Sequence, residues 1–148
     1  MPVPGGRPVR VTADPGIVPL ESPDGRHLYY VSAADRPSTL WQMRVAGGRP
    51  VKLVDGVLFG NFAVVDDGIY YLERVTSRAT DGGARGAGAS AADIRLQFYD
   101  LSRGRAITIA TNLGMAGHGL SASRDGRHIF FARVDSTIDE LMLVDDFR

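Results

Sequence analysis

The sequence predicts an all-β fold with essentially no helix, and two observations lead to this prediction. One is a turn signal that recurs along the chain and is followed each time by aliphatic and aromatic residues; its copies are Ser22–Val31, Val65–Leu72 and Ser123–Ala132. The Asp-Gly pair in each copy suits a tight hairpin turn, while branched and aromatic residues favour strands. The other observation is that no segment longer than about ten residues has a helical period. The 18 glycines and 8 prolines agree with this, because short strands need many turns.

Four strands can be assigned in order around each turn. The predicted ranges are Ile17–Ser22, Gly60–Val65 and Gly119–Ser123 for the first strand, His27–Ser32, Ile69–Val75 and His128–Val134 for the second, Thr39–Val45, Ile94–Asp100 and Glu140–Asp145 for the third, and Val51–Val54 and Ala106–Ala110 for the fourth, with a further copy of the fourth at Val9–Thr12. The glycines of the first two turns, Gly25 and Gly68, are 43 positions apart. A repeat of about 40–45 residues with four strands is typical of a β-propeller blade. We therefore expect a partial β-propeller of about three four-stranded antiparallel blades.

The predicted blades divide the chain at three points. Residues 1–14 end a preceding blade, 15–56 and 57–112 are blades, and 113–148 form a last blade of three strands. Residues 77–92 are rich in glycine and alanine and have no apolar period, which predicts a flexible insertion in the middle blade. Propellers close with about four to eight blades, and the repeat places Met1 inside a strand. We therefore expect the C-terminal part of a longer propeller, whose unpaired faces make the isolated chain self-associate.

Three segments together carry a resemblance to a known family. They are the turn Ser22–Arg26, the third strand Leu40–Val45 and the glycine pair Gly47–Gly48. The combination resembles the TolB-like, WD-related propeller repeat of bacteria, in which a Ser-Pro-Asp-Gly turn opens the second strand and a Leu-Trp pair marks the third. The other copies depart from this pattern, since Arg124 stands where proline is usual and Arg95-Leu96 replaces the Leu-Trp pair in the middle copy.

The end of the chain adds a second resemblance. Asp139–Arg148 looks like the end of propeller domains at the C-termini of large bacterial regulators. Such proteins carry a winged-helix DNA-binding domain or a Ser/Thr kinase domain at the other end, often with a membrane span between. The resemblance implies a place in a sensor, kinase, transcriptional regulator or envelope protein, and favours the periplasm or cell envelope. The chain itself shows no export signal.

Charge and composition argue against several functions. The 17 basic and 17 acidic side chains give zero net charge, which argues against contact with nucleic acid or an anionic membrane. The absence of cysteine excludes disulfides, thiolate zinc sites and cysteine nucleophiles. No apolar run reaches the roughly 20 residues of a membrane span. We expect no cofactor, no metal and no membrane insertion.

The titratable residues offer one candidate for binding. His118 lies between two glycines, and we expect it on a loop where it contacts a ligand or partner. His27 and His128 occupy equivalent positions after the turns, and a catalytic pair has no reason to obey the structural repeat. The aspartates of the three turns are expected to cap them through Asx-type hydrogen bonds; they are Asp24, Asp67 and Asp125. No catalytic residue is predicted.

These observations favour a non-enzymatic interaction or scaffold module, whose partner is a protein or the missing blades. One alternative is the accessory propeller of an enzyme, such as a propeller-gated serine peptidase, with catalytic residues outside this chain. The glycine-rich segment Gly82–Gly88 lacks the Gly-Lys-Ser/Thr end of a phosphate-binding loop. A gene remnant without function is a third alternative that the sequence leaves open.

Overall fold

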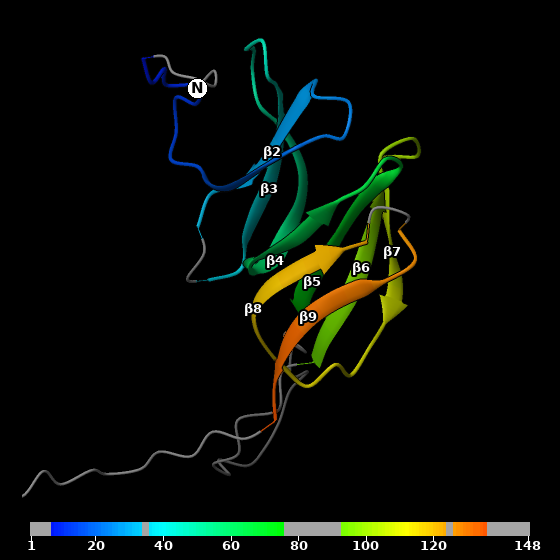
Figure 1. Ribbon diagram of the computed structural model, residues 1–148. Helices are drawn as coiled ribbons and strands as arrows, with labels where there is room; N and C mark the ends of the chain where they lie inside the picture. Colours follow the sequence, from blue (N-terminus) through cyan, green and yellow to red (C-terminus); the bar gives the residue numbers. More distant parts are fainter. Residues whose placement is uncertain (1–6, 34–35, 76–92, 124–125, 136–148) are drawn as a thin grey trace, which may run out of the picture.

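The computed structural model of the protein describes residues 7–33, 36–75, 93–123 and 126–135 (Figure 1). These residues form nine strands, which are β1 Ile17–Glu21, β2 His27–Val31, β3 Ser38–Arg44, β4 Val51–Val64, β5 Gly68–Val75, β6 Asp93–Asp100, β7 Arg105–Ala110, β8 Met115–Ala122 and β9 Ile129–Val134. They form no helix, so none of them belongs to a helix long and apolar enough to cross a membrane. The all-β prediction is therefore confirmed for the described part of the chain.

The strands form two antiparallel sheets. The larger sheet holds β1 to β7 in chain order, and because β1 and β7 are its two edges it is not closed; β8 pairs only with β9. The predicted strands Val51–Val54 and Gly60–Val65 are the two ends of one strand, β4, which pairs with β3 and then with β5. Separate four-stranded blades are thus not confirmed, because the first two share a continuous strand.

A bend in β4 allows its two halves to belong to different layers. Gly56, Phe59 and Gly60 have φ of 83°, 52° and 67°, and the pairing register breaks between Val57 and Phe62. Positive φ is uncommon outside glycine and turns the chain sharply. The bend therefore lets the sheet before it fold over the sheet after it.

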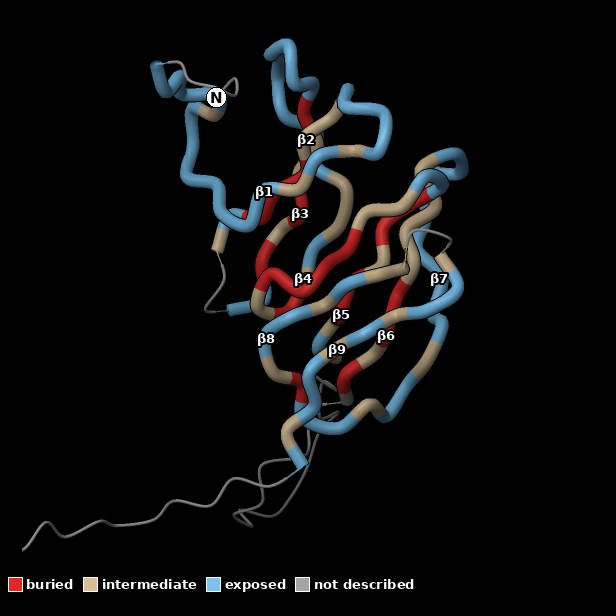
Figure 2. The backbone as a smooth tube through the Cα atoms, viewed as in Figure 1, coloured by how far each residue is buried: buried red, intermediate tan, exposed pale blue. Residues whose placement is uncertain are grey.

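Three layers result, and we number them in chain order. Layer 1 contains β1, β2, β3 and the first half of β4, layer 2 contains the second half of β4 with β5, β6 and β7, and layer 3 contains β8 and β9. The core between layers 1 and 2 consists of Tyr29, Val31, Leu40, Val57, Phe62, Ile69 and Tyr71. The core between layers 2 and 3 consists of Leu58, Leu72, Ile94, Leu96 and Ala116, with Leu120, Ile129 and Phe131 packed against it. Figure 2 shows these buried residues running through the middle of the stack.

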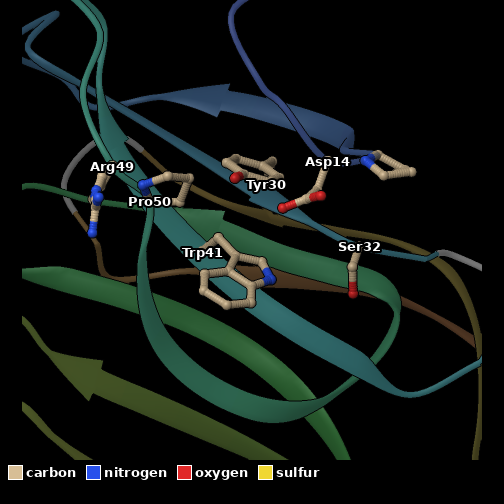
Figure 3. Close-up of a pocket in the computed structure, with 7 residues that line it drawn as sticks. Asp14, Tyr30, Ser32, Trp41, Arg49 and Pro50 are labelled. Carbon is tan, nitrogen blue, oxygen red and sulfur yellow. The ribbon is translucent and has the colours of Figure 1, made fainter.

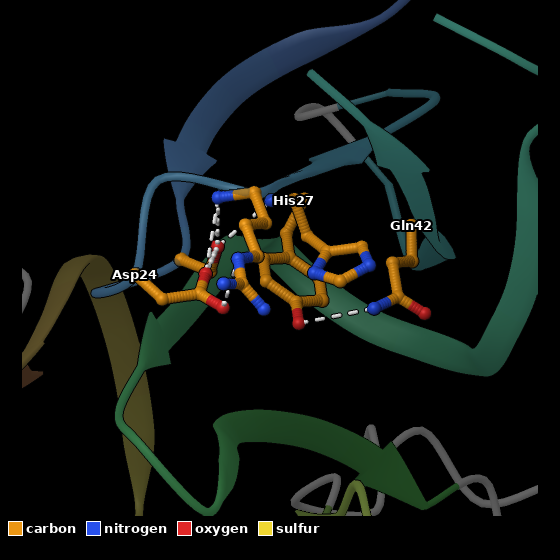
Figure 4. Close-up of polar contacts among 6 residues, drawn as sticks. Asp24, His27 and Gln42 are labelled. Carbon is orange, nitrogen blue, oxygen red and sulfur yellow. Dashed lines mark hydrogen bonds and ion pairs between the residues drawn. The ribbon is translucent and has the colours of Figure 1, made fainter. Parts of the chain in front are cut away.

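The turns before β2 and β9 share a hydrogen-bonding pattern that follows from their sequence. The Ser22 hydroxyl accepts the His27 N–H at 2.8 Å and donates to Asp24 at 2.6 Å, and Asp24 accepts the Arg26 N–H at 3.0 Å (Figure 4). The Ser123 hydroxyl likewise accepts the His128 N–H, at 2.9 Å. The prediction that Asp24 caps its turn is therefore confirmed.

The middle turn is different. Its hairpin closes from the Val65 N–H to the Gly68 carbonyl at 2.9 Å, so only Asp66 and Asp67 lie between the bonded residues. Within the described residues the Asp67 side chain makes no hydrogen bond, and only its backbone carbonyl is used, by the Leu101 N–H at 3.2 Å. The prediction of an Asx cap at Asp67 is wrong, because two residues leave no room for the four-residue turn of the other layers.

One predicted strand is also wrong. Val9–Thr12 is described and belongs to no strand, and Val9 and Val11 are 80% and 55% exposed. A strand is stable only where its backbone groups pair with a neighbour, and no described strand pairs with this segment. The predicted insertion at 77–92, the strand Glu140–Asp145 and the turn residue Asp125 lie outside the described residues.

Candidate functional site at the inner strands

The first strand of each layer is interrupted at the same place. Register shifts fall between Ile17 and Leu20 in β1, between Val57 and Phe62 in β4, and between Ala116 and Leu120 in β8. β4 contacts both β1 and β8, so the three interruptions lie near one another. We call these strands the inner strands. β-Bulges change the direction of side chains and are frequent beside functional sites. The three bulges of the inner strands are therefore a candidate functional site.

The bulges hold the backbone in conformations that cost free energy. Val18 and Phe59 both have φ of 52°, and Gly119 has φ of 108°. A branched residue in the left-handed region is a genuine outlier, at a cost of about 1–3 kcal/mol. Gly60 allows the inner strands to approach, because a Cβ atom there would lie 2.9 Å from the Val18 side chain. Strain kept in this way is typical of functional sites.

Asn61 fixes two inner strands to each other. Its amide nitrogen donates to the Gly117 carbonyl at 2.8 Å, and its amide oxygen accepts the Gly119 N–H at 2.7 Å. Asn61 is only 2% exposed, whereas Gly117 is half-buried and Gly119 is exposed, so the two hydrogen bonds are partly shielded from water. A side-chain amide that bonds two backbone groups of a bulge specifies its shape, because a buried polar group left unpaired is costly. Asn61 therefore determines how the residue between the two glycines is presented.

That residue is His118, the histidine singled out by the sequence. It is exposed, but it lies within the strand β8 and not on the predicted loop, because Met115–Ala122 pairs with β9 on both sides of the bulge. Its ring centroid is 5.0 Å from that of Phe59 on β4. The imidazole thus offers hydrogen-bonding nitrogens beside an aromatic ring at the surface. The other two histidines, His27 and His128, follow hairpin turns in layers 1 and 3. Among the residues that the structure describes, no group of three His, Cys, Asp or Glu side chains is arranged to hold a metal ion.

A second concave site lies on the outer side of layer 1 (Figure 3). This pocket, which we call the Trp41 pocket, has a volume of about 530 Å³ and is lined by Asp14, Pro15, Tyr30, Ser32, Trp41, Arg49 and Pro50. Tyr30 and Trp41 are directly paired across β2 and β3, which gives the pocket an aromatic floor. Burial, and after it the Asp14 carboxylate, raise the pKa of the Tyr30 hydroxyl, which stays a donor at neutral pH.

A third, shallower groove separates layers 1 and 2 at their turn ends. Its volume is about 300 Å³, and it lies between the turn that carries Asp24 and His27 and the turn that carries Asp66. The Gln42 amide nitrogen donates to the Tyr29 hydroxyl at its floor, at 3.2 Å (Figure 4). The Asp24 carboxylate in this groove is bonded within its own turn. The groove is therefore a polar boundary between two layers.

The structure thus places His118 next to residues that sequence reasoning missed. Asn61 and Val18 belong to predicted strands without a role of their own, and Phe59 lies between two predicted strands. A signal for Asn61 exists, since it is the single polar residue within the apolar run Val57–Val65. Its partner strand, more than 50 residues away in the chain, follows from no local pattern.

Comparisons of the sequence with models of known protein families and with curated proteins found no match. The resemblance to TolB-like, WD-related repeats therefore remains a prediction from the turn and strand residues that carry it.

Proposed function

We propose that this chain is a non-enzymatic β-propeller interaction module that binds a protein partner at its inner strands. In this proposal each layer is a blade, β1, the second half of β4 and β8 are the strands nearest the axis, and Phe59 and His118 belong to the binding surface. The module is the C-terminal part of a longer bacterial sensor, kinase, transcriptional regulator or envelope protein, with the periplasm or cell envelope as its location.

One observation carries the proposal, namely that the same inner-strand bulge recurs in all three layers. Face-to-face stacking of repeated antiparallel units is the way in which propeller blades bury their strands. Bulges in every unit cost pairing energy in every unit, and Val18 and Phe59 add backbone strain. The loss of pairing and the backbone strain recur at equivalent positions of the inner strands. Their recurrence is explained if the inner strands present side chains to a partner.

The test is site-specific photo-crosslinking in the cells that make the protein. A benzophenone amino acid at position 118 is expected to give one discrete adduct with a different protein, because His118 is exposed beside Phe59. The matched control places the same amino acid at Arg105, which is also exposed and lies on β7, the far edge of the sheet.

Each outcome has a clear meaning. An adduct at position 118 that is absent at position 105 supports the inner strands as a binding surface. The same adducts from both positions, or none from position 118, would show that the bulged strands are not the site of recognition. The adduct mass distinguishes a foreign partner from a second copy of this chain.

A further inference from the structure

The outer side of layer 3 presents an apolar face that nothing in the described residues covers. Met115 and Phe130 are 57% and 61% exposed, and they lie on the side of β8 and β9 opposite to the core residues Ala116 and Phe131. We call this surface, formed by Met115, Phe130, Ala132 and Val134, the donating face. Large apolar side chains exposed together on one face of a sheet mark an interaction surface.

The repeat shows what the donating face corresponds to. Counted from the backbone hydrogen bond that closes each hairpin, Phe130 is equivalent to Tyr29 in layer 1 and Tyr70 in layer 2. Tyr29 belongs to the core between layers 1 and 2, and Tyr70 packs against the core between layers 2 and 3. In both cases the aromatic ring leaves its own layer and packs against the next one. Among the residues that the structure describes, no layer follows Phe130.

The residues against which these aromatic rings pack are also repeated from layer to layer. Tyr29 shares its core with Ile69 and Tyr71 of the next layer, and Tyr70 shares its surroundings with Ile129 and Phe131. The equivalent pair in layer 1 is Leu28 and Tyr30, which follow the same hairpin closure. These two residues, together with Trp41 and Met43 on the neighbouring strand, form what we call the receiving face of the chain. Tyr30 and Met43 are 4% and 3% exposed, so a partner reaches this face through the Trp41 pocket.

The receiving face contains the Trp41 pocket (Figure 3). The volume of about 530 Å³ is ample for a phenylalanine side chain, and its floor is the Tyr30–Trp41 pair. Tyr30 is 4% exposed, yet its hydroxyl makes no hydrogen bond within the described residues, although every fully buried side-chain polar atom there has a partner. The hydroxyl therefore opens into the pocket and is available to whatever fills it.

We propose that the receiving face binds the donating face of a second copy of this chain, with Phe130 of one copy seated in the Trp41 pocket of the other. The contact continues the stacking that already joins layers 1, 2 and 3, and it rests on the propeller-type stacking of the proposed function.

Charge does not oppose this association. The chain has zero net charge, so two copies do not repel each other. The pocket carries one charge of each sign, Asp14 and Arg49, and the donating hairpin carries the ion pair of Arg133 and Asp135 at 2.6 Å. Neither face presents an excess of one sign to the other.

The test begins with the mass of the whole chain in solution. Analytical ultracentrifugation at tens of micromolar is expected to give twice the chain mass. Trp41 is the single tryptophan, and because it lines the pocket its emission should shift to longer wavelength as the protein is diluted and the pocket fills with water. A protein that is monomeric at these concentrations overturns the proposal.

Two variants each disrupt one of the two faces and leave the core residues unchanged. Phe130→Ser removes the exposed ring, and Ser32→Arg fills the pocket from an exposed position. Each is expected to weaken dimerisation at least tenfold, as for a central aromatic anchor. Because the contact is head-to-tail, mixing the two variants restores one intact junction and should give a heterodimer. If the mixture stays monomeric, the interface does not join unlike faces and the proposal fails.

A matched control removes an equally exposed apolar residue elsewhere. Ile109→Ser lies on β7 and Ile109 is 50% exposed, so it should leave the mass and the Trp41 emission unchanged. Thermal melts of all three variants verify that they fold. If Ile109→Ser dissociates the dimer as strongly as Phe130→Ser does, the association is non-specific. A monomer that still gives the position-118 adduct would refute this inference alone, whereas loss of that adduct in a dimer would refute only the proposed partner site.

Discussion

Asn61→Ala is expected to be among the most destabilising single changes in the protein. It removes the hydrogen bonds at 2.8 Å and 2.7 Å to the Gly117 carbonyl and the Gly119 N–H. Both groups then lie unpaired where Asn61 was 2% exposed. A buried polar group without a partner costs about 1–3 kcal/mol, and because these two groups are only partly buried we expect the free energy of unfolding to fall by about 2–3 kcal/mol. This is a large part of the roughly 5–15 kcal/mol of a typical domain.

Urea unfolding followed by circular dichroism measures this loss, and hydrogen exchange of the Gly119 amide locates it. The matched control is Gln42→Ala, which removes a half-buried amide with a single hydrogen bond of 3.2 Å and should cost about 1 kcal/mol. If Asn61→Ala loses no more stability than Gln42→Ala and the Gly119 amide exchanges as slowly as before, the reasoning about the two partly shielded hydrogen bonds is refuted.

Three further predictions test other features. Gly68→Ala should prevent folding or cost several kcal/mol in a thermal melt, because its Cβ atom would collide with the Phe98 ring and with a backbone carbonyl. Val18→Asn should raise the free energy of unfolding in urea by about 1 kcal/mol, because asparagine tolerates φ of 52° better than valine. Hydrogen bonds from the Ser102 hydroxyl, and then from backbone amides of that turn, hold the pKa of Asp100 at about 2, below its ordinary 3.8. The stability they give is therefore present above about pH 4 and lost toward pH 2, and Asp100→Asn should flatten the melting temperature over that range.

Each of these three predictions has a control variant or an outcome that contradicts it. Gly16→Ala is the comparison for Gly68→Ala and should cost less, since its Cβ atom would lie 2.7 Å from the Tyr30 ring and would meet no backbone atom at that distance. Val18→Ala keeps a β-carbon at the strained φ and should give no gain, so equal effects of the alanine and asparagine variants would contradict the strain argument. An unchanged acid transition in Asp100→Asn would show that its turn does not contribute.

The sequence could predict the strands because their signals are local. The turn Ser22–His27 contains the hydrogen-bond partners that define it, and the apolar run behind it pairs with the nearby strands β1 and β3. Accordingly, β2 ends one residue earlier than predicted, and β3 begins and ends one residue earlier than predicted. The alternation of faces along β2, with Tyr29 inward and Tyr30 outward, also follows from the period of two residues.

The candidate site could be predicted only in part. The flanking glycines marked His118, but its neighbour Phe59 and its support Asn61 reach it across two strands more than 50 residues apart in the chain. The same limit explains the error at Val9–Thr12, whose alternation suits a strand while pairing depends on a neighbour that the segment itself does not specify. The continuity of β4 was missed because Gly56 indicates a break locally, and only pairing on both sides shows that the strand continues.

The shared strand β4 sets the order in which the molecule opens. Layers 1 and 2 are joined by a core and by the continuous strand β4, whereas layer 3 shares no strand with layer 2 and is joined to it by a core, the Asn61 amide and the contact of Phe59 with His118. In a stack where each unit contacts only its neighbours, cooperativity is set by these junctions. Layers 1 and 2 therefore unfold as one unit, and the hairpin of β8 and β9 detaches first, at a free energy below that of the whole chain.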